Sequence, residues 1–257
     1  MDFTLDAYSR LLDALAGYGV ATVEDFLSGK ASEPFCVLRH DVDRFPSRAS
    51  RMARMEKARG VRATYYFRWM PEATPDFPGV PGFPEKEVLE CKLFGHEVGY
   101  HYENLSEIGD KDKALEDFGS KLAILRELAP VRTVAMHGSP LSRVDNADLL
   151  RGVDLNKHGL LGDPHISGKF EDVAYITDTG RKWSSGEASV RDRLGRPLGE
   201  RIKGTEHLVE VMNSQRYKRV MVNTHPQRWA RGKVEWLSEL VGQNVRNVGK
   251  MFLRSRQ

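Results

Sequence analysis

Strand-like runs alternate with helical patterns along most of this chain, and this alternation limits the folds that it can adopt. Alternating strands and helices favour a parallel sheet, and seven such units favour a barrel. We therefore predict an α/β fold, a deformed (β/α)7-type barrel with a short helical N-terminal extension. The predicted strands are residues 35–43, 63–68, 97–102, 133–137, 159–163, 174–177 and 220–225.

The first 34 residues do not follow this alternation. Tyr8, Leu11 and Leu15 have helical spacing, and Thr22 stands at the start of a short capped helix. We expect two units: a helical N-terminal extension, residues 1–34, packed on a (β/α) barrel domain, residues 35–257.

Composition restricts the class of protein. Of the 257 residues, 40% are hydrophobic and 29% are charged, which is typical of a soluble globular protein. No apolar run approaches the roughly eighteen residues of a membrane span. The first residues lack the basic and then apolar pattern of a signal peptide, and the two cysteines, Cys36 and Cys91, give no disulfide framework. We expect a cytoplasmic location.

The formal net charge is +3, and much of the excess lies in one helical segment between Arg44 and Arg62. We interpret its arginines as a solvated helix face, with a patch for an anionic glycan or nucleotide as the alternative. The sequence contains no basic-aromatic interleaving or known nucleic-acid motif, so we expect no nucleic-acid partner.

Polar side chains stand where the predicted strands end. In a βα barrel the C-terminal strand ends meet at one mouth, where active sites form. We therefore predict a catalytic or binding pocket there. The residues in question are Asp41 and Asp43, Arg68, His101 and Glu103, His137 and Ser139, Asp163 and His165, Asp178, and His225.

Asp41 and Asp43 are the most informative of these residues. Residues two apart on a strand point to the same side, so the two carboxylates share a face and His40 lies on the other. Neighbouring carboxylates repel each other and persist best where a cation or a proton transfer uses them. The alternative is an ordinary turn, in which Asp is common.

Several segments resemble those of a known family. Residues 39–43 (Arg-His-Asp-Val-Asp), residues 95–101 (Gly-His-Glu-Val-Gly-Tyr-His) and His225 resemble motifs of the polysaccharide deacetylase superfamily, the family 4 carbohydrate esterases. The resemblance covers about residues 35–229 and is closest to a subgroup with His-Asp-x-Asp in place of Asp-Asp. Residues 136–140, 177–183 and 223–229 also resemble that subgroup.

The resemblance implies an enzyme that removes an N-acetyl group from an amino sugar. Asp41 matches the general base, His225 the general acid, and Asp43 and His101 two ligands of a divalent metal, expected to be zinc. Zinc polarises an amide carbonyl and lowers the pKa of a bound water. A histidine suits protonation of the departing amine because its pKa is near neutral.

One position departs from the family pattern. The family has a second metal-binding histidine four residues after the one that matches His101, and this chain has Leu105 there. His96 would lie on the opposite face of the strand, and we expect it to be a packed core histidine. His137, which stands where the family usually has an arginine-containing motif, is our expected third ligand, and Glu103 is the second choice.

We expect the substrate to contact further residues at the mouth. Trp183 and Trp229 either stack on a sugar ring or pack in the core. The proline- and glycine-rich segment 71–84 is expected to be a loop that shapes the pocket. The expected substrate-binding residues are Arg68, Glu103, Asp178, Trp183, Arg228 and Trp229.

These observations favour a carbohydrate-modifying amide hydrolase that acts on an N-acylated amino sugar or a surface-glycan intermediate. A cytoplasmic location favours a nucleotide-linked or lipid-linked sugar over a polymer. One alternative keeps the fold but catalyses another amide or C–N reaction without the usual metal triad. The other alternative is a glycan-binding pseudoenzyme, which would need neither Asp41 nor His225.

Overall fold

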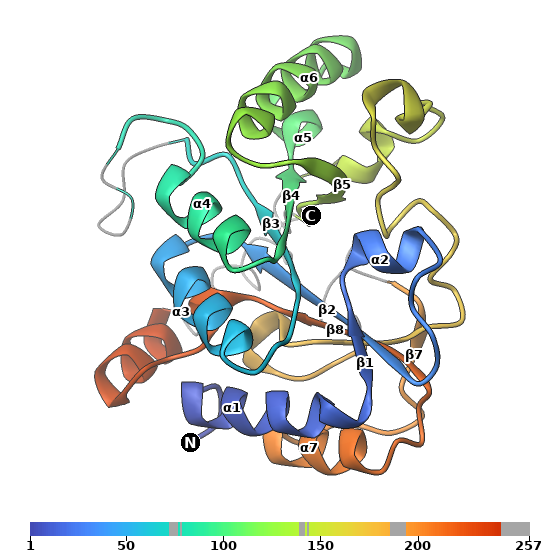
Figure 1. The fold of residues 1–257 in the computed structure, drawn as a ribbon. Coiled ribbons are helices and arrows are strands. Elements are labelled where there is room, and N and C mark those ends of the chain that lie inside the picture. Colours follow the sequence, from blue (N-terminus) through green and yellow to red (C-terminus); the bar gives the residue numbers. More distant parts are fainter. Residues whose placement is uncertain (72–76, 78, 139–141, 143, 186–193, 243–257) are drawn as a thin grey trace, which may run out of the picture.

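The strands form one sheet in an α/β fold (Figure 1). The computed structural model describes residues 1–71, 77, 79–138, 142, 144–185 and 194–242. The strands are β1 (Gly19–Ala21), β2 (Phe35–Val42), β3 (Thr64–Phe67), β4 (Glu97–Tyr102), β5 (Val131–Met136), β6 (Ala174–Thr177), β7 (Arg196–Pro197) and β8 (Arg219–Thr224).

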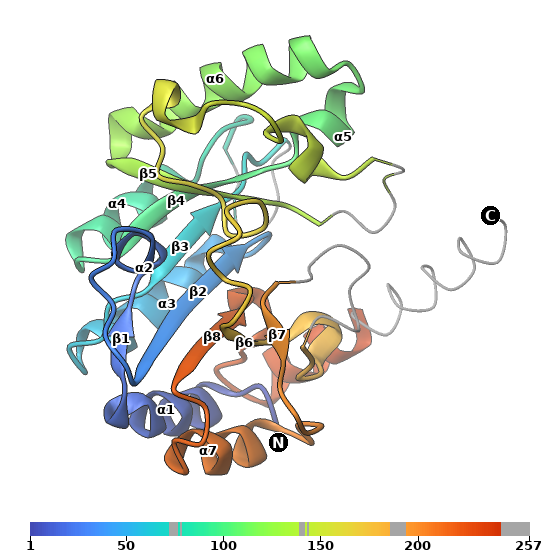
Figure 2. The same ribbon diagram turned by 90° about the vertical axis from the view of Figure 1, so that its right-hand side faces the viewer.

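Helices surround this sheet (Figures 1 and 2). The α-helices are α1 (Leu5–Ala14), α2 (Val23–Leu27), α3 (Pro46–Lys57), α4 (Glu85–Leu93), α5 (Asn104–Ile108), α6 (Lys111–Leu128) and α7 (Thr205–Asn213). The 3-10 helices are η1 (Leu15–Gly17), η2 (Asn146–Leu149), η3 (Leu155–His158), η4 (Thr179–Arg181) and η5 (Pro226–Arg228).

The strand order is β5-β4-β3-β2-β8-β6-β7, and β1 pairs with the first half of β2. Every pairing between these strands is parallel. The predicted α/β fold with a parallel sheet of at least seven strands is confirmed. The order begins at β5 and ends at β7, so strand pairing among the described residues does not close the sheet into a ring. β2 and β8 are neighbours, with His40 opposite Thr224 as their last registered pair.

Most strand predictions are confirmed, and β4 and β6 have the predicted bounds. Residues 159–163 form no strand. Gly162 makes only an isolated bridge to Thr133, and Asp163 instead uses its carboxylate to accept the backbone N–H groups of Met136 and His165. β1 and β7 were not predicted, because three and two residues are too few to show a period.

Both faces of the central strand β2 are buried, which is why its first four residues, 35–38, form a continuous apolar run. Phe35 and Val37 belong to a smaller core, together with residues of α2 and of the neighbouring strands. Cys36 and Leu38 point the other way, into the larger core beneath the helices. The alternation along β2 therefore separates an inner face, which carries Asp41, from an outer face.

The N-terminal segment is more than a helical extension. Thr4 caps α1 and Thr22 caps α2 through their side-chain oxygens, as expected for the second helix. Between these helices β1 joins the sheet, so segment 1–34 is not wholly helical. α1 lies alongside α7 in both views (Figures 1 and 2). The division of the chain at residue 34 stays a prediction.

Other expectations concern the surface and the thiols. Among the described residues, no helix combines the length and apolar character needed to cross a bilayer. Cys36 and Cys91 are both buried as free thiols. In the expected loop 71–84, residues 72–76 and 78 lie outside the described residues, and so does Ser139.

Candidate functional site

Four of the expected strand-end residues meet around one carboxylate. Asp43 follows β2, His101 lies on β4, and His137 and His225 follow β5 and β8. Asp43 Oδ1 lies 3.4 Å from His101 Nε2 and 3.7 Å from His137 Nε2, and Asp43 Oδ2 lies 3.9 Å from His225 Nε2. Parallel strands bring these side chains together because their carboxyl ends share one edge of the sheet.

The hydrogen bonds of two rings determine which nitrogen faces Asp43. His101 donates its Nδ1 hydrogen to the Ala135 carbonyl over 3.0 Å, and His137 donates its Nδ1 hydrogen to Glu103 Oε2 over 2.9 Å. Nε2 of each ring is therefore the nitrogen that can accept a metal ion. Carbonyl and carboxylate partners of this kind orient histidine ligands in metal sites.

The donor set fits a divalent metal. One oxygen of Asp43 and one nitrogen each of His101 and His137 all lie within 4.8 Å of one another. Asp43 Oδ2 accepts a hydrogen bond from Gln227 over 2.8 Å, whereas Oδ1 is buried and has no hydrogen-bond partner among the described residues. An oxygen and two imidazole nitrogens form a ligand set that suits zinc.

Electrostatics at the site favours the charged forms of its acidic groups. Burial alone would raise the pKa of Asp43, but the imidazoles of His101, His137 and His225 bring it well below its usual range. Burial lowers the pKa of His137, and hydrogen bonding to Glu103 together with the charge of Asp43 outweighs this effect, so that the pKa is raised.

Leu105 and Glu103 are not ligands. Leu105 is 7% exposed and packs in the larger core. Glu103 was the second choice for the third ligand and an expected substrate contact, but its carboxylate accepts from His137 and forms an ion pair with Arg68. Glu103 therefore supports His137 through Oε2, and Arg68 holds Glu103 through Oε1.

His225 is held by a buried carboxylate. Its Nδ1 lies 2.6 Å from Asp178 Oδ1, so Nε2 points toward Asp43. Asp178 also accepts hydrogen bonds from Arg228 Nη1 and Trp229 Nε1, each over 3.0 Å. Asp178, Arg228 and Trp229 were expected to contact the substrate, but their hydrogen bonds orient His225 instead.

The sugar-stacking interpretation of the two tryptophans is wrong. Trp229 is 0% exposed, and its ring packs against Phe3 and Tyr8. Trp183 is 5% exposed, packs against Trp229, and donates its ring N–H to Thr205. The aromatic spacing was compatible with either role, and the core-packing alternative is the one observed.

Asp41 is bound on both carboxylate oxygens. Arg39 donates to Oδ1 over 2.8 Å and to Oδ2 over 2.9 Å, and Asn223 donates to Oδ2 over 3.0 Å. Burial would raise the pKa of Asp41, but Arg39 and the imidazoles of His101 and His225 lower it well below its usual range. The carboxylate is therefore ionised and fixed in orientation.

The sequence interpretation missed Arg39, Asn223 and Gln227 as parts of the site. Arg39 could have been found, because it lies two residues before Asp41 and hence on the same face of the strand. Its guanidinium group forms an ion pair with Asp41. Asn223 and Gln227 flank His225 in sequence, and nothing in their residue type indicates their partners.

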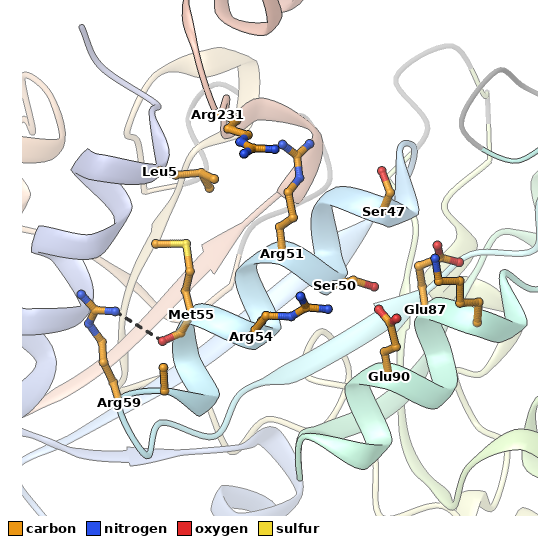
Figure 3. Close-up of a pocket in the computed structure, with 12 residues that line it drawn as sticks. Leu5, Ser47, Ser50, Arg51, Arg54, Met55, Arg59, Glu87, Glu90 and Arg231 are labelled. Atoms are coloured by element: carbon orange, nitrogen blue, oxygen red, sulfur yellow. Dashed lines mark hydrogen bonds between the residues drawn. The ribbon is translucent and has the colours of Figure 1, made fainter.

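The arginine-rich helix is solvated in part: Arg54 and Arg59 are exposed, whereas Arg48 is buried. A groove of about 500 Å³ lies beside α3. Figure 3 shows Arg51, Arg54, Arg59 and Arg231 among the side chains that line it. Arg51 forms an ion pair with Glu235, and Arg59 forms one with Asp13. These pairs neutralise two of the four arginines around the groove.

His96 is the packed histidine that was expected. Its ring is buried, Nε2 lies 2.9 Å from the Ala53 carbonyl, and Nδ1 accepts from the Ala63 N–H over 3.2 Å. Both ring nitrogens are thus used by the backbone, and the ring lies away from the Asp43 cluster.

No family model matches the sequence, and no curated protein matches it significantly. Solved structures of similar fold include a mutant CE4 family pseudoenzyme, at 12% identity and a TM-score of 0.45, which covers 88% of this chain and 64% of that one. IcaB from Ammonifex degensii has 16% identity, a TM-score of 0.45, and coverage of 81% and 88%. A family 4 carbohydrate esterase from Bacillus anthracis has 12% identity, a TM-score of 0.41, and coverage of 95% and 84%.

This chain thus spans about two thirds of the length of the first of these structures, 64%. These proteins include both esterases and a pseudoenzyme.

Proposed function

We propose that this protein is a metal-dependent amide hydrolase of polysaccharide deacetylase type, which removes the acyl group from an N-acylated amino sugar. One observation carries the proposal: Asp43 lies between two histidines oriented for metal binding and a third histidine that a buried carboxylate orients. Ligands and a proton-transfer group at one position are what metal-assisted amide hydrolysis needs.

The proposal assigns the metal ligands and the general base to different residues. Asp43, His101 and His137 would hold the metal, which when bound would polarise the amide carbonyl and acidify the attacking water. Asp41 remains ionised and accepts the proton of that water. Arg39 and Asn223 hold the Asp41 carboxylate in place, at the cost of making it a weaker base.

His225 supplies the second proton transfer. With Nδ1 hydrogen-bonded to Asp178, the protonated ring donates from Nε2 to the nitrogen of the breaking C–N bond. The water oxygen forms the new bond to the acyl carbon, the C–N bond breaks, and the products are a carboxylate and an amino sugar. Arg228 and Trp229 keep Asp178 in position through this step.

The substrate class rests on the resemblance of residues 39–43, 95–101 and 223–229 to the deacetylase motifs. A nucleotide-linked or lipid-linked amino sugar is proposed because of the expected cytoplasmic location. The alternative of a reaction without a metal triad is weakened, because His137 lies where it could be the third ligand that Leu105 cannot be.

The test is release of the acyl group by the purified protein. Acetate would be measured with a nucleotide-linked N-acetylamino sugar and with N-acetylglucosamine oligomers, in the presence of zinc and after chelation. We expect release that is lost on chelation, restored by zinc and absent from Asp43→Asn. Asp172→Asn is the control, because that side chain is 59% exposed and lies in an ion pair with Arg219. Absence of release from every substrate by zinc-loaded protein would leave a glycan-binding protein as the better account.

A further inference from the structure

A second group of buried ionisable residues lies on the outer face of the sheet. Glu56 of α3 is 0% exposed, and its Oε1 lies 2.9 Å from His40 Nε2. Its Oε2 accepts a hydrogen bond from Tyr65 over 2.8 Å. Tyr8 of α1 also donates to Glu56 Oε1. The mechanism above uses none of these side chains.

His40 connects this group to the neighbouring strand. Its Nδ1 lies 2.6 Å from Thr224 Oγ1. A carboxylate only accepts hydrogen bonds, so His40 Nε2 carries the hydrogen toward Glu56, and Nδ1 shares a hydrogen bond with the Thr224 hydroxyl, which can donate or accept. A continuous chain therefore leads from Glu56 through His40 to Thr224.

The position of this chain relative to the site is specific. His40 and Thr224 are the last registered pair of β2 and β8, and each immediately precedes a residue of the proposed acid–base pair, Asp41 or His225. Among the described residues, the registered pairing of the two strands ends there. The contact between His40 and Thr224 thus joins the strands on the outer face, immediately before the two reactive groups, whereas Asn223 joins them on the inner face at Asp41.

The same strands are otherwise apolar on this face. Cys36, Leu38 and Val42 of β2 and Val220 and Val222 of β8 all lie in the larger core. Apolar side chains could fill the space that Glu56 and His40 occupy without the free-energy cost of desolvating a carboxylate. A buried carboxylate is destabilising unless hydrogen bonds or ion pairs compensate this cost. Fully bonded polar networks do, however, fix geometry more tightly than apolar contacts.

We propose that Glu56, His40 and Thr224 form a positioning unit that sets Asp41 relative to His225 from behind the sheet. Tyr8 brings the N-terminal helix into the same unit, so α1 contributes to the site although it lies outside the segment that resembles the deacetylases. This assignment rests on the proposed function for the roles of Asp41 and His225. The three side chains touch no substrate and act only through the strand ends.

Thr224→Val tests the unit, because it keeps the shape of the side chain and removes the hydroxyl. The matched control is Thr64→Val: Thr64 is equally buried and donates to a buried carboxylate, Glu97, but it lies at the start of β3, away from the mouth. Both variants should lower Tm. Only Thr224→Val should lower kcat, by about ten- to a hundredfold with KM unchanged, since small misplacements of reacting groups have effects of this size. Thr224→Ser should restore most of the loss.

Nitrogen-15 NMR of the histidine rings provides a readout that does not need turnover. The His225 signals, assigned through His225→Asn, should shift in Thr224→Val and Glu56→Gln and stay in place in Thr64→Val. The proposal is overturned if Thr224→Val lowers Tm as the control does but leaves kcat and the His225 signals unchanged. If the wild-type protein hydrolyses nothing, the proposed function fails, and the His225 signals alone decide whether the positioning unit exists.

Discussion

Asp178→Asn is the substitution whose effect the structure specifies in most detail. Asp178 is fully buried and accepts from both the ring and the backbone N–H of His225, from Trp229 and from Arg228. An amide in its place has only one acceptor atom. Either the backbone and indole donors or the His225 ring must then face an NH2 group.

The size of the effect follows from these contacts. Breaking a buried charged pair costs about 3–5 kcal/mol, and the remaining Arg228 guanidinium keeps that cost near the upper part of the range. If the NH2 group faces Nδ1, the His225 ring must carry its only proton on Nε2, and its cycle as an acid is blocked. Loss of general acid catalysis lowers turnover by about 10²–10⁴-fold.

The assay is acetate release at saturating substrate, measured beside urea unfolding. Glu97→Gln is the control, because Glu97 is also a buried, hydrogen-bonded carboxylate. It is the first residue of β4 and therefore lies at the end of the strand away from His101 and the site. Glu97→Gln should lower the free energy of unfolding and leave the turnover per folded molecule equal to that of the wild type. Equal turnover by Asp178→Asn and wild type would refute the role of the Asp178–His225 pair, however much stability was lost.

Three further predictions follow from the geometry. His137→Ala should weaken zinc binding by more than about a hundredfold in a chelator competition, whereas His96→Ala should change it little; equal effects would remove His137 from the ligand set. Burial would raise the pKa of Asp163, but its interactions with His165 and Tyr102 lower it, so this carboxylate stabilises the fold above its unfolded pKa of about 4, and the contribution is lost as pH falls through the folded value. Unfolding of Asp163→Asn should therefore depend less on pH below about 4 than that of the wild type, and parallel curves would contradict this. Trp183→Leu should lower Tm and leave KM unchanged; a raised KM with unchanged Tm would return Trp183 to the sugar site.

The sequence was sufficient to predict that the site residues lie close together, because this follows from the parallel arrangement of the strands. Polar residues at the carboxyl ends of parallel strands must come close, whatever the detailed register, and Asp43, His101, His137 and His225 did so. The same reasoning could not separate residues that face the substrate from those behind them. Asp178 and Arg228 stand at strand ends too, but they face His225.

The roles of some residues and short strands depend on contacts with residues that are distant in sequence, and these contacts could not be predicted. A tryptophan packs in a core or lines a pocket with the same local pattern, and only the proximity of Phe3 and Tyr8 decides the matter for Trp229. The strands β1 and β7 exist because longer neighbours pair with them rather than through their own periodicity. His40 lies beside the informative Asp41, yet its role depends on Glu56 and Thr224, far away in sequence.

Diffraction at the zinc absorption edge tests the central claim most directly. Crystals grown with zinc should show one strong anomalous peak, bonded at roughly 2 Å to Asp43 Oδ1 and to Nε2 of His101 and His137. Crystals of His137→Ala, grown in the same way, should lose most of that peak. A wild-type map without a peak at these three atoms, obtained from protein that keeps full activity in a strong chelator, would contradict a metal-dependent hydrolase.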